Sequence, residues 1–282
     1  MGENPLLSDP DLKLVKKELQ KLDFMIVQDI FMTETAELAD VVLPVASFAE
    51  KDGTFSNTER RVQRIRKAIE APGEAKTDWE VICGISNKMG YAMGYSSAKE
   101  IFEEVAKVTP SYAGISYERL EKGGLQWPCP TPEHPGTRFL HKDKFSRGLG
   151  LLSAIEYIPP DELPDKEYPF LLSTGRVLYH YHTGTMTTRT KGLTERYPES
   201  LVEINPVDAD KLKIIEGQKV RVTSRRGTVE AKASITRRSA PGSIFMNFHF
   251  AEASVNVLTN PALDPIGKIP EYKVCAVKLE AA

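Results

Sequence analysis

The sequence predicts an α/β domain followed by a β-rich domain, and three observations support this. Helix-like and short apolar segments alternate over residues 1–108, whereas residues 165–282 are mostly strand-like. Between them, residues 109–164 contain many Pro and Gly, which interrupt any periodicity. Alternating helices and buried strands favour a layered α/β fold, and successive strands favour a sandwich or barrel. We therefore expect two domains joined by a connecting segment.

The N-terminal domain should begin with a helix and two strands. Apolar residues recur every three or four positions over residues 11–22, which predicts an amphipathic helix. Residues 23–29 and 39–44 are apolar but too short for helices, so we expect buried strands there. The stretch at 53–63 is polar and rich in turn residues, and we expect a loop.

Two further helices complete the α/β part. Thr77 and Asp78 can cap a helix that ends before Gly90, with Trp79, Ile82, Cys83 and Met89 sharing one face. Ser97 and Glu100 have the spacing of a capping box ahead of an amphipathic segment ending near residue 107.

The C-terminal domain should consist of strands with one short helix. Alternating residues on both sides of the Arg226-Gly227 turn predict a hairpin over 219–236. Pro206 suits the first turn of a helix at 206–214. The other strand-like segments are 168–174, 200–205, 242–248 and 273–280.

Composition excludes several classes of protein. The chain carries 37 Lys and Arg against 39 Asp and Glu, a formal net charge of −2, so nothing suggests a nucleic-acid partner. No apolar stretch approaches the ~18 residues of a membrane span, and the polar N-terminus does not resemble a secretory signal. Three cysteines without a CxxC motif fit a reducing compartment, and we expect a cytoplasmic protein.

The strongest candidate ligand site lies at residues 173–185, directly after a predicted strand. This segment combines Arg176, His180, His182 and several hydroxyls with two glycines that permit close backbone approach. It is compatible with an anionic or heterocyclic ligand, and equally with a polar barrel loop that binds nothing. A zinc site is weaker, because no nearby carboxylate or cysteine completes the ligand set.

Other candidates have simpler explanations. Four arginines between residues 53 and 66 could meet phosphates or form a solvated face, and Asp78 could bind a base or only cap a helix. Cys83 and Cys275 lie on apolar faces and Cys129 lies in a loop. No GxSxG, P-loop, HExxH or GxGxxG motif occurs. The residues alone indicate ligand binding without an obvious catalytic group.

Seven segments of the sequence carry a resemblance to a known protein family. They are DFMIVQDIFMTETAELADVVLPVASFAEKDGTFSNTERRVQ, KTDW, QWPCP, YPFLLSTGRVLYHYHTGTMT, LVEINPVDADKL, NVLTNP and IPEYKVCAV. In this order and spacing, they resemble the C-terminal part of molybdopterin-guanine-dinucleotide formate dehydrogenases. The resemblance implies a partial Rossmann-like molybdopterin oxidoreductase domain, then a molybdopterin dinucleotide-binding double-psi β-barrel. It also implies a cofactor, bis-molybdopterin guanine dinucleotide carrying Mo or W.

The resemblance assigns cofactor contacts to two groups of residues, and neither catalytic nor metal-ligating residues to this chain. The guanosine and diphosphate site would be lined by Gly2, Glu3, Asn4, Gln28, Asp29 and Thr33, with Asp78 facing the guanine. The pterin contacts would come from Arg176, His180, Asn256, Tyr272 and Lys273, with Thr174, His182, Thr183 and Thr259 as weaker candidates.

The resemblance also implies what must come from elsewhere. In this family the metal-binding Sec or Cys and the iron–sulfur cluster ligands lie upstream of the matching part. We therefore expect an upstream polypeptide and electron-transfer subunits as partners, and formate oxidation to CO2, or its reverse, as the joint activity. A strand that should precede Gly2-Glu3-Asn4 is also expected upstream. The alternatives are a component of a formylmethanofuran dehydrogenase or nitrate reductase type enzyme, and a non-catalytic protein that binds pterin dinucleotides.

Overall fold

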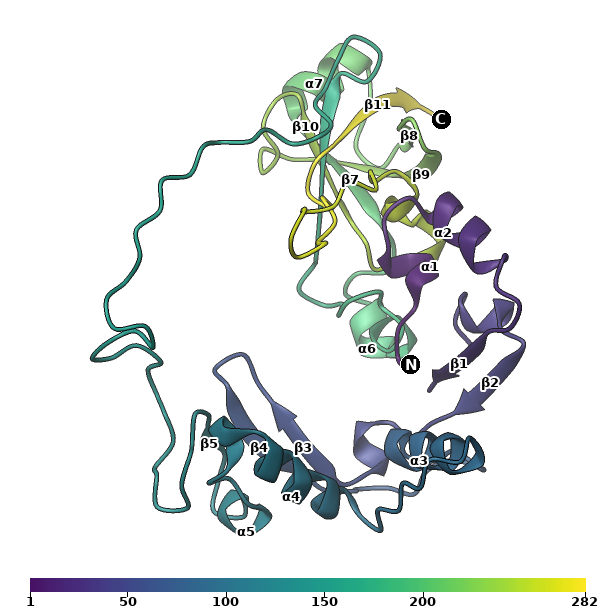
Figure 1. Ribbon diagram of the computed structural model, residues 1–282. Helices are drawn as coiled ribbons and strands as arrows, with labels where there is room; N and C mark the ends of the chain where they lie inside the picture. The colour runs from purple at the N-terminus through teal and green to yellow at the C-terminus, as the bar shows by residue number, and fades with distance from the viewer. The chain divides into compact units, whose positions relative to one another are not determined.

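The computed structural model describes residues 1–282, which form two compact units (Figure 1). Unit 1 comprises Met1–Val42 and Tyr157–Ala282, and unit 2 comprises Leu43–Glu156. The predicted fold class, α/β elements followed by a β-barrel, is confirmed. The domain limits placed at residues 108 and 164 stay a prediction. None of the helices has the length and hydropathy needed to cross a bilayer.

Unit 1 is built on a closed six-stranded barrel. Its strands are β6 (Phe170–Gly175), β7 (Leu201–Ile204), β8 (Lys219–Thr223), β9 (Thr228–Ile235), β10 (Ser243–Asn247) and β11 (Cys275–Ala281). They follow one another around the barrel in the order β10, β6, β11, β8, β9, β7. The pairs β6–β10 and β7–β9 are parallel, and the other four pairs are antiparallel.

Alternation along the strands fills the barrel with apolar side chains. In β9, Val229, Ala231 and Ala233 point inward, as the period of two predicts. The predicted hairpin is confirmed, because β8 and β9 pair from Thr223 and Thr228 outward. The most enclosed core residues come from several strands and one loop: Leu172, Val202, Ile204, Val220, Val222, Ile244, Met246, Leu258 and Val277. Removal of this apolar area from water is the main contribution to barrel stability.

Short helices and a small sheet complete unit 1. The helices are α1 (Pro5–Ser8), α2 (Leu12–Leu19), α6 (Lys191–Thr194) and α7 (Pro206–Leu212). Strand β1 (Ile26–Asp29) pairs with β2 (Val41–Pro44), whose first two residues belong to unit 1. Helix α7 begins as predicted, with the Asn205 side chain accepting a hydrogen bond from the amide of Val207 at 3.0 Å. The predicted burial of both strands holds for β1 but is wrong for β2, which has no buried residue.

Unit 2 has its own three-stranded sheet and helices. Its elements are β3 (Gly53–Ser56), β4 (Arg61–Ile65), α3 (Asp78–Lys88), α4 (Ala98–Val108), α5 (Tyr117–Leu120) and β5 (Leu125–Gln126). The core contains Val62, Phe102, Ile115, Tyr117, Leu120 and Cys129. The first part of the Pro- and Gly-rich segment is therefore packed structure, and its loop cysteine is fully buried.

Two predictions in unit 2 are wrong in detail. The expected loop at 53–63 is a hairpin of β3 and β4, in which the Asn57 side chain accepts the amides of Glu59 and Arg61, both at 3.0 Å. These bonds hold the turn, so strands form despite the polar composition. Met89 is 81 % exposed, so it does not share the packed face of α3 with the buried Cys83.

Candidate functional site

One end of the barrel gathers the candidate residues because two of its strands are parallel. Strands β6 and β10 run side by side, with Gly175 opposite Asn247, so their carboxyl ends lie at the same edge. The loops that leave these ends, residues 176–200 and 248–274, therefore emerge together. Ligand loops commonly leave from the carboxyl ends of strands in this way.

His249 joins the two loops through both ring nitrogens. Its Nδ1 donates to the carbonyl of His182, and its Nε2 accepts the amide of Val177 at 2.9 Å. Burial lowers the pKa of His249, which suits a neutral ring with one donor and one acceptor. Gly184 allows the loops to approach, because its φ is +75° and a Cβ there would lie 2.3 Å from the carbonyl oxygen of His249.

A pocket of about 390 Å³ lies beside this junction. We call it the cationic pocket and define it by ten lining residues: Glu3, Ser8, Asp9, Thr174, Arg176, His182, Phe248, Asn256, Tyr272 and Lys273. Seven of them were predicted from the sequence, and Ser8, Asp9 and Phe248 were missed. Ser8 and Asp9 follow the predicted Gly2-Glu3-Asn4 loop closely, and Phe248 ends a predicted strand segment, so proximity in sequence was the available signal.

The cationic side of the pocket is cross-linked by hydrogen bonds. Lys273 Nζ donates to the carbonyl of Thr174 at 2.7 Å, and Thr174 Oγ1 donates to the carbonyl of Tyr272 at 2.6 Å. Burial and the nearby charge of Arg176 lower the pKa of Lys273. Burial, with the charges of Asp9 and Glu3, raises the pKa of Tyr272 to about 12, so its hydroxyl stays protonated at neutral pH.

The N-terminal segment contributes two acidic residues, Glu3 and Asp9, to the pocket. Burial raises the pKa of Asp9, whose carboxylate accepts the hydroxyl of Ser8 at 3.2 Å. Asn256 ties this segment to the barrel loop, because its Nδ2 donates to the carbonyl of Leu7 at 2.7 Å and to that of Ser8 at 3.3 Å. Two cations and two carboxylates thus line one cavity.

A second, polar pocket of about 470 Å³ includes two more predicted residues, Thr33 and Thr183. Arg189, Glu34 and His249 also line it. Arg189 lies over the ring of Phe31, with its guanidinium carbon 4.5 Å from the ring centroid. The sequence analysis did not select Arg189, Glu34 or His249, because none of them stands in a recognisable motif.

A third group forms at the carboxyl end of β1. The amide of Gly2 donates to the carbonyl of Gln28 at 2.8 Å, and Asp29 accepts the amides of Ile30 and Phe31. Asn4 is buried and bonds on both sides: its Oδ1 accepts the hydroxyl of Thr35 at 2.6 Å and its Nδ2 donates to Glu34 at 2.6 Å. The predicted residues Gly2, Asn4, Gln28 and Asp29 are therefore neighbours.

Three predicted residues lie elsewhere. His180 is buried, with its ring nitrogens bonded to the Thr187 hydroxyl at 3.1 Å and the Tyr197 carbonyl at 2.7 Å. Thr259 is fully buried and donates to the carbonyl of Asn256 at 3.2 Å. Neither lines the pockets described above. Asp78 begins α3 in unit 2 and is ion-paired with Lys51.

Two protein-family models match this chain, one over its N-terminal part and one over the barrel. Residues 1–88 match the molybdopterin oxidoreductase family, and residues 170–276 match the molydopterin dinucleotide binding domain. This chain contains a molybdopterin oxidoreductase segment and a molydopterin dinucleotide binding domain. The second match covers the whole barrel except its last residues, and it contains every barrel residue of the cationic pocket.

Individual molybdopterin oxidoreductases match along the whole chain. The F420-dependent formate dehydrogenase subunit alpha of Methanocaldococcus jannaschii is 58 % identical over 99 % of this chain and 42 % of that protein. Formate dehydrogenase H of Escherichia coli and the assimilatory nitrate reductase catalytic subunit of Bacillus subtilis are each 40 % identical over 99 % of this chain. The chain spans about two fifths of the length of these curated relatives.

The fold comparison agrees. Acetylene hydratase from Pelobacter acetylenicus superposes over 100 % of this chain and 44 % of its own, with a TM-score of 0.75 and 19 % identity. At this identity the match concerns the fold alone.

The donor set of the cationic pocket fits a pterin dinucleotide. Arg176 and Lys273 lack carboxylate partners and can bind phosphate or carbonyl oxygens. The carboxylates of Glu3 and Asp9 can accept hydrogen bonds from the amino groups of a pterin or guanine ring.

Proposed function

We propose that this chain is the cofactor-enclosing C-terminal portion of a formate dehydrogenase catalytic subunit. The observation that carries the proposal is the 58 % identity to an F420-dependent formate dehydrogenase subunit alpha along 99 % of the chain. Two such subunits from Methanococcus maripaludis are 56 % and 55 % identical. The B. subtilis nitrate reductase is more distant at 40 %, which favours formate over nitrate.

In this proposal the chain holds bis-molybdopterin guanine dinucleotide with residues of two areas. Arg176, Asn256, Tyr272 and Lys273 contact pterin groups, supported by Thr174 and His182 in the same pocket. Gly2, Glu3, Asn4, Gln28, Asp29 and Thr33 serve the guanosine and diphosphate, and Asp78 faces the guanine. His180, Thr183 and Thr259 belong to the same proposed set, although His180 and Thr259 would act from behind the surface.

The chain's own residues bind and orient rather than react. Oxidation of formate to CO2 releases one proton and two electrons, and the bound metal dinucleotide supplies the centre that accepts the electrons. The protonated hydroxyl of Tyr272 can donate a hydrogen bond, and Lys273 supplies a cation held in place by Thr174. The carboxylates of Glu3 and Asp9 line the same cavity as the two cations.

The proposal requires partners. A polypeptide corresponding to the remaining part of the relatives would supply the metal ligand, Sec or Cys, and the iron–sulfur cluster. Electron-transfer subunits would follow, and the complex would work in the cytoplasm. The chain alone should therefore oxidise no formate, whether the metal is Mo or W.

Purification of the chain from its source, with mass spectrometry of bound polypeptides and metal analysis, tests this. We expect an iron–sulfur polypeptide, stoichiometric Mo or W, releasable guanine nucleotide and formate-dependent dye reduction. An Arg176→Gln/Lys273→Gln variant should lose bound nucleotide, whereas Lys232→Gln, on the outside of β9, should retain it. Recovery of the chain alone and free of metal would refute a catalytic role. Nitrate-dependent dye oxidation instead would favour the nitrate reductase alternative.

A further inference from the structure

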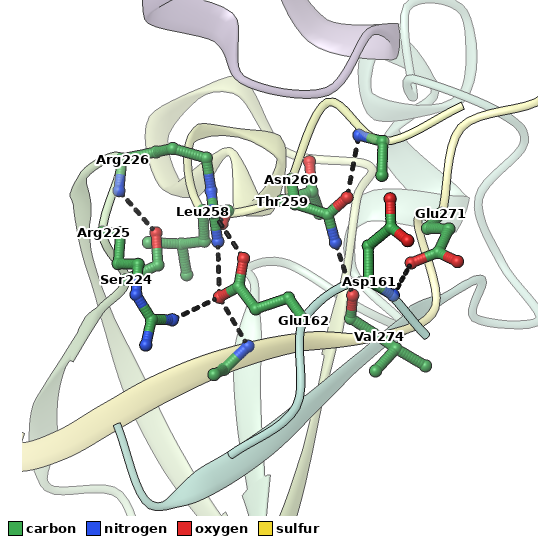
Figure 2. Close-up of polar contacts among 12 residues, drawn as sticks. Asp161, Glu162, Ser224, Arg225, Arg226, Leu258, Thr259, Asn260, Glu271 and Val274 are labelled. Atoms are coloured by element: carbon green, nitrogen blue, oxygen red, sulfur yellow. Dashed lines mark hydrogen bonds and ion pairs between the residues drawn. The ribbon is translucent and has the colours of Figure 1, made fainter. Parts of the chain in front are cut away.

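Glu162 lies eight residues before β6 and turns back onto the barrel (Figure 2). Its carboxylate receives both terminal nitrogens of Arg226, at 2.6 and 2.9 Å, in a bidentate pair. Arg225 donates to it at 2.9 Å, and the amide of Ala276 at 3.0 Å. One carboxylate therefore contacts the β8–β9 turn and the start of β11.

This cluster is largely shielded from water. The side chains of Glu162 and Arg226 are 12 % and 13 % exposed. Charges removed from water are tolerated only when their hydrogen-bonding capacity is met, and here both carboxylate oxygens are occupied. Arg226 uses its remaining Nε to donate to the carbonyl of Leu258 at 2.8 Å. The cluster consequently has one well-bonded arrangement.

The bond from Arg226 to Leu258 supports the first of two loops that line the cationic pocket. Leu258 follows the short 3₁₀ helix Val255–Val257, which contains Asn256. Asn256 lines the pocket and holds the N-terminal segment through the carbonyls of Leu7 and Ser8. Glu162 thus helps to hold the loop of Asn256 in place by bonding to Arg226, which in turn bonds to Leu258.

The bond from the amide of Ala276 to Glu162 supports the second loop that lines the pocket, which carries Tyr272 and Lys273. Ala276 follows Tyr272 and Lys273 by only a few residues, and both line the pocket. Two further bonds support the same loop: Asn260 Nδ2 donates to the carbonyl of Val274 at 2.9 Å, and the amide of Asp161 donates to Glu271 at 3.1 Å (Figure 2).

We infer that Glu162 is a positioning residue that fixes both loops presenting Asn256, Tyr272 and Lys273 to the cationic pocket. The connecting segment is thereby coupled to ligand binding, although Glu162 itself does not line the pocket. That the ligand is an anionic dinucleotide rests on the proposed function. The effect on loop order does not.

The test compares three variants of the full chain. Glu162→Gln keeps the side-chain size and removes the charge, and Glu162→Asp keeps the charge on a shorter stem. Asp165→Asn is the matched control, because Asp165 pairs with the same Arg225 but contacts neither pocket loop. Amide hydrogen exchange is measured by mass spectrometry, and affinity for inorganic pyrophosphate by calorimetry.

We expect Glu162→Gln to speed exchange about tenfold in peptides covering 254–262 and 271–277, with β6 and β10 unchanged. Pyrophosphate affinity should fall, Glu162→Asp should restore part of both effects, and Asp165→Asn should match the parent. Exchange like that of Asp165→Asn, or uniform loss of protection across the barrel, would overturn the inference. If the parent chain binds no pyrophosphate, the proposed function is weakened while the exchange result still decides the role of Glu162.

Discussion

Arg176 and Lys273 approach one cavity from two loops, and neither is neutralised by a carboxylate partner. We expect Arg176→Gln or Lys273→Gln to weaken pyrophosphate binding about tenfold each, since a hydrogen bond to a charged group contributes roughly 1.5 kcal/mol or more. Calorimetric titration measures this. Lys232→Gln, which removes an exposed cation paired with Glu199, provides the control. Unchanged affinity in both pocket variants would place the anion elsewhere.

Glu162 should make the stability of the barrel depend on pH in the acidic range. Burial alone would raise its pKa, but bonds from Arg226 and the Ala276 amide, with the charges of Arg226 and Arg225, bring the pKa below the ordinary 4.5. A lowered folded pKa gives stability that is present above pH 4.5 and lost as pH falls through the folded value. The buried Cys275 thiol, with a pKa raised to about 12, adds no charge here.

Urea unfolding followed by circular dichroism between about pH 7 and pH 3 measures this dependence. The stability difference between the parent and Glu162→Gln should be largest near neutrality and shrink on acidification. A difference that stays constant with pH would show that the charge of Glu162 contributes nothing.

Single residues were predictable where the ligand chemistry and the sequence neighbourhood agreed. Arg176 was found in this way and Lys273 through the family resemblance, and the structure brings both to one pocket. His180 and Thr259 have the same chemistry, yet their polar atoms bond to Tyr197 and Asn256 inside the protein. Sequence does not show which polar groups are already satisfied by distant carbonyls. Their assignment as cofactor contacts stays a prediction.

The loop after β6 depends on one glycine. Gly184 has a φ of +75°, and any Cβ there would meet the carbonyl oxygen of His249 at 2.3 Å. We expect Gly184→Ala to destabilise unit 1 by at least about 1 kcal/mol and to disturb the His182–His249 bond. Urea unfolding and the NMR signal of the His249 ring report both effects. Gly192→Ala, in α6 with open space around it, should be neutral or slightly stabilising.

Elements with strong periodicity were predicted well, and polar or Pro-rich ones were not. The β8–β9 hairpin follows from alternation around Arg226-Gly227. The β3–β4 hairpin was missed because its stability comes from Asn57 bonds in the turn and from packing of Val62. In the segment after Thr109, for which the sequence predicts a connection between domains, Ile115 and Cys129 are buried in the core of unit 2. Long-range packing of this kind leaves no local period.

Across the whole molecule, the segment that joins the units should be the first site of proteolysis. Residues 141–156 are all exposed and contain no helix or strand, and they include Lys142, Lys144 and Arg147. We expect brief trypsin treatment to cut there first, leaving a barrel fragment that mass spectrometry can identify. Arg226, largely shielded in its cluster with Glu162, should remain uncut over the same time. Early cleavage at Arg226 would contradict the described cluster.

The closed order of the strands has a consequence for biosynthesis. Strand β11 follows the other five strands in sequence, lies between β6 and β8 and pairs with both, so the barrel is an open sheet until residue 281 has left the ribosome. Docking of β11 also fixes the loop of Tyr272 and Lys273, because the amide of Ala276 in β11 then bonds to Glu162. A large ligand can therefore find a finished site at this end only after β11 has been synthesised, and until then the nascent barrel, with edges free to mispair, would depend most on chaperones.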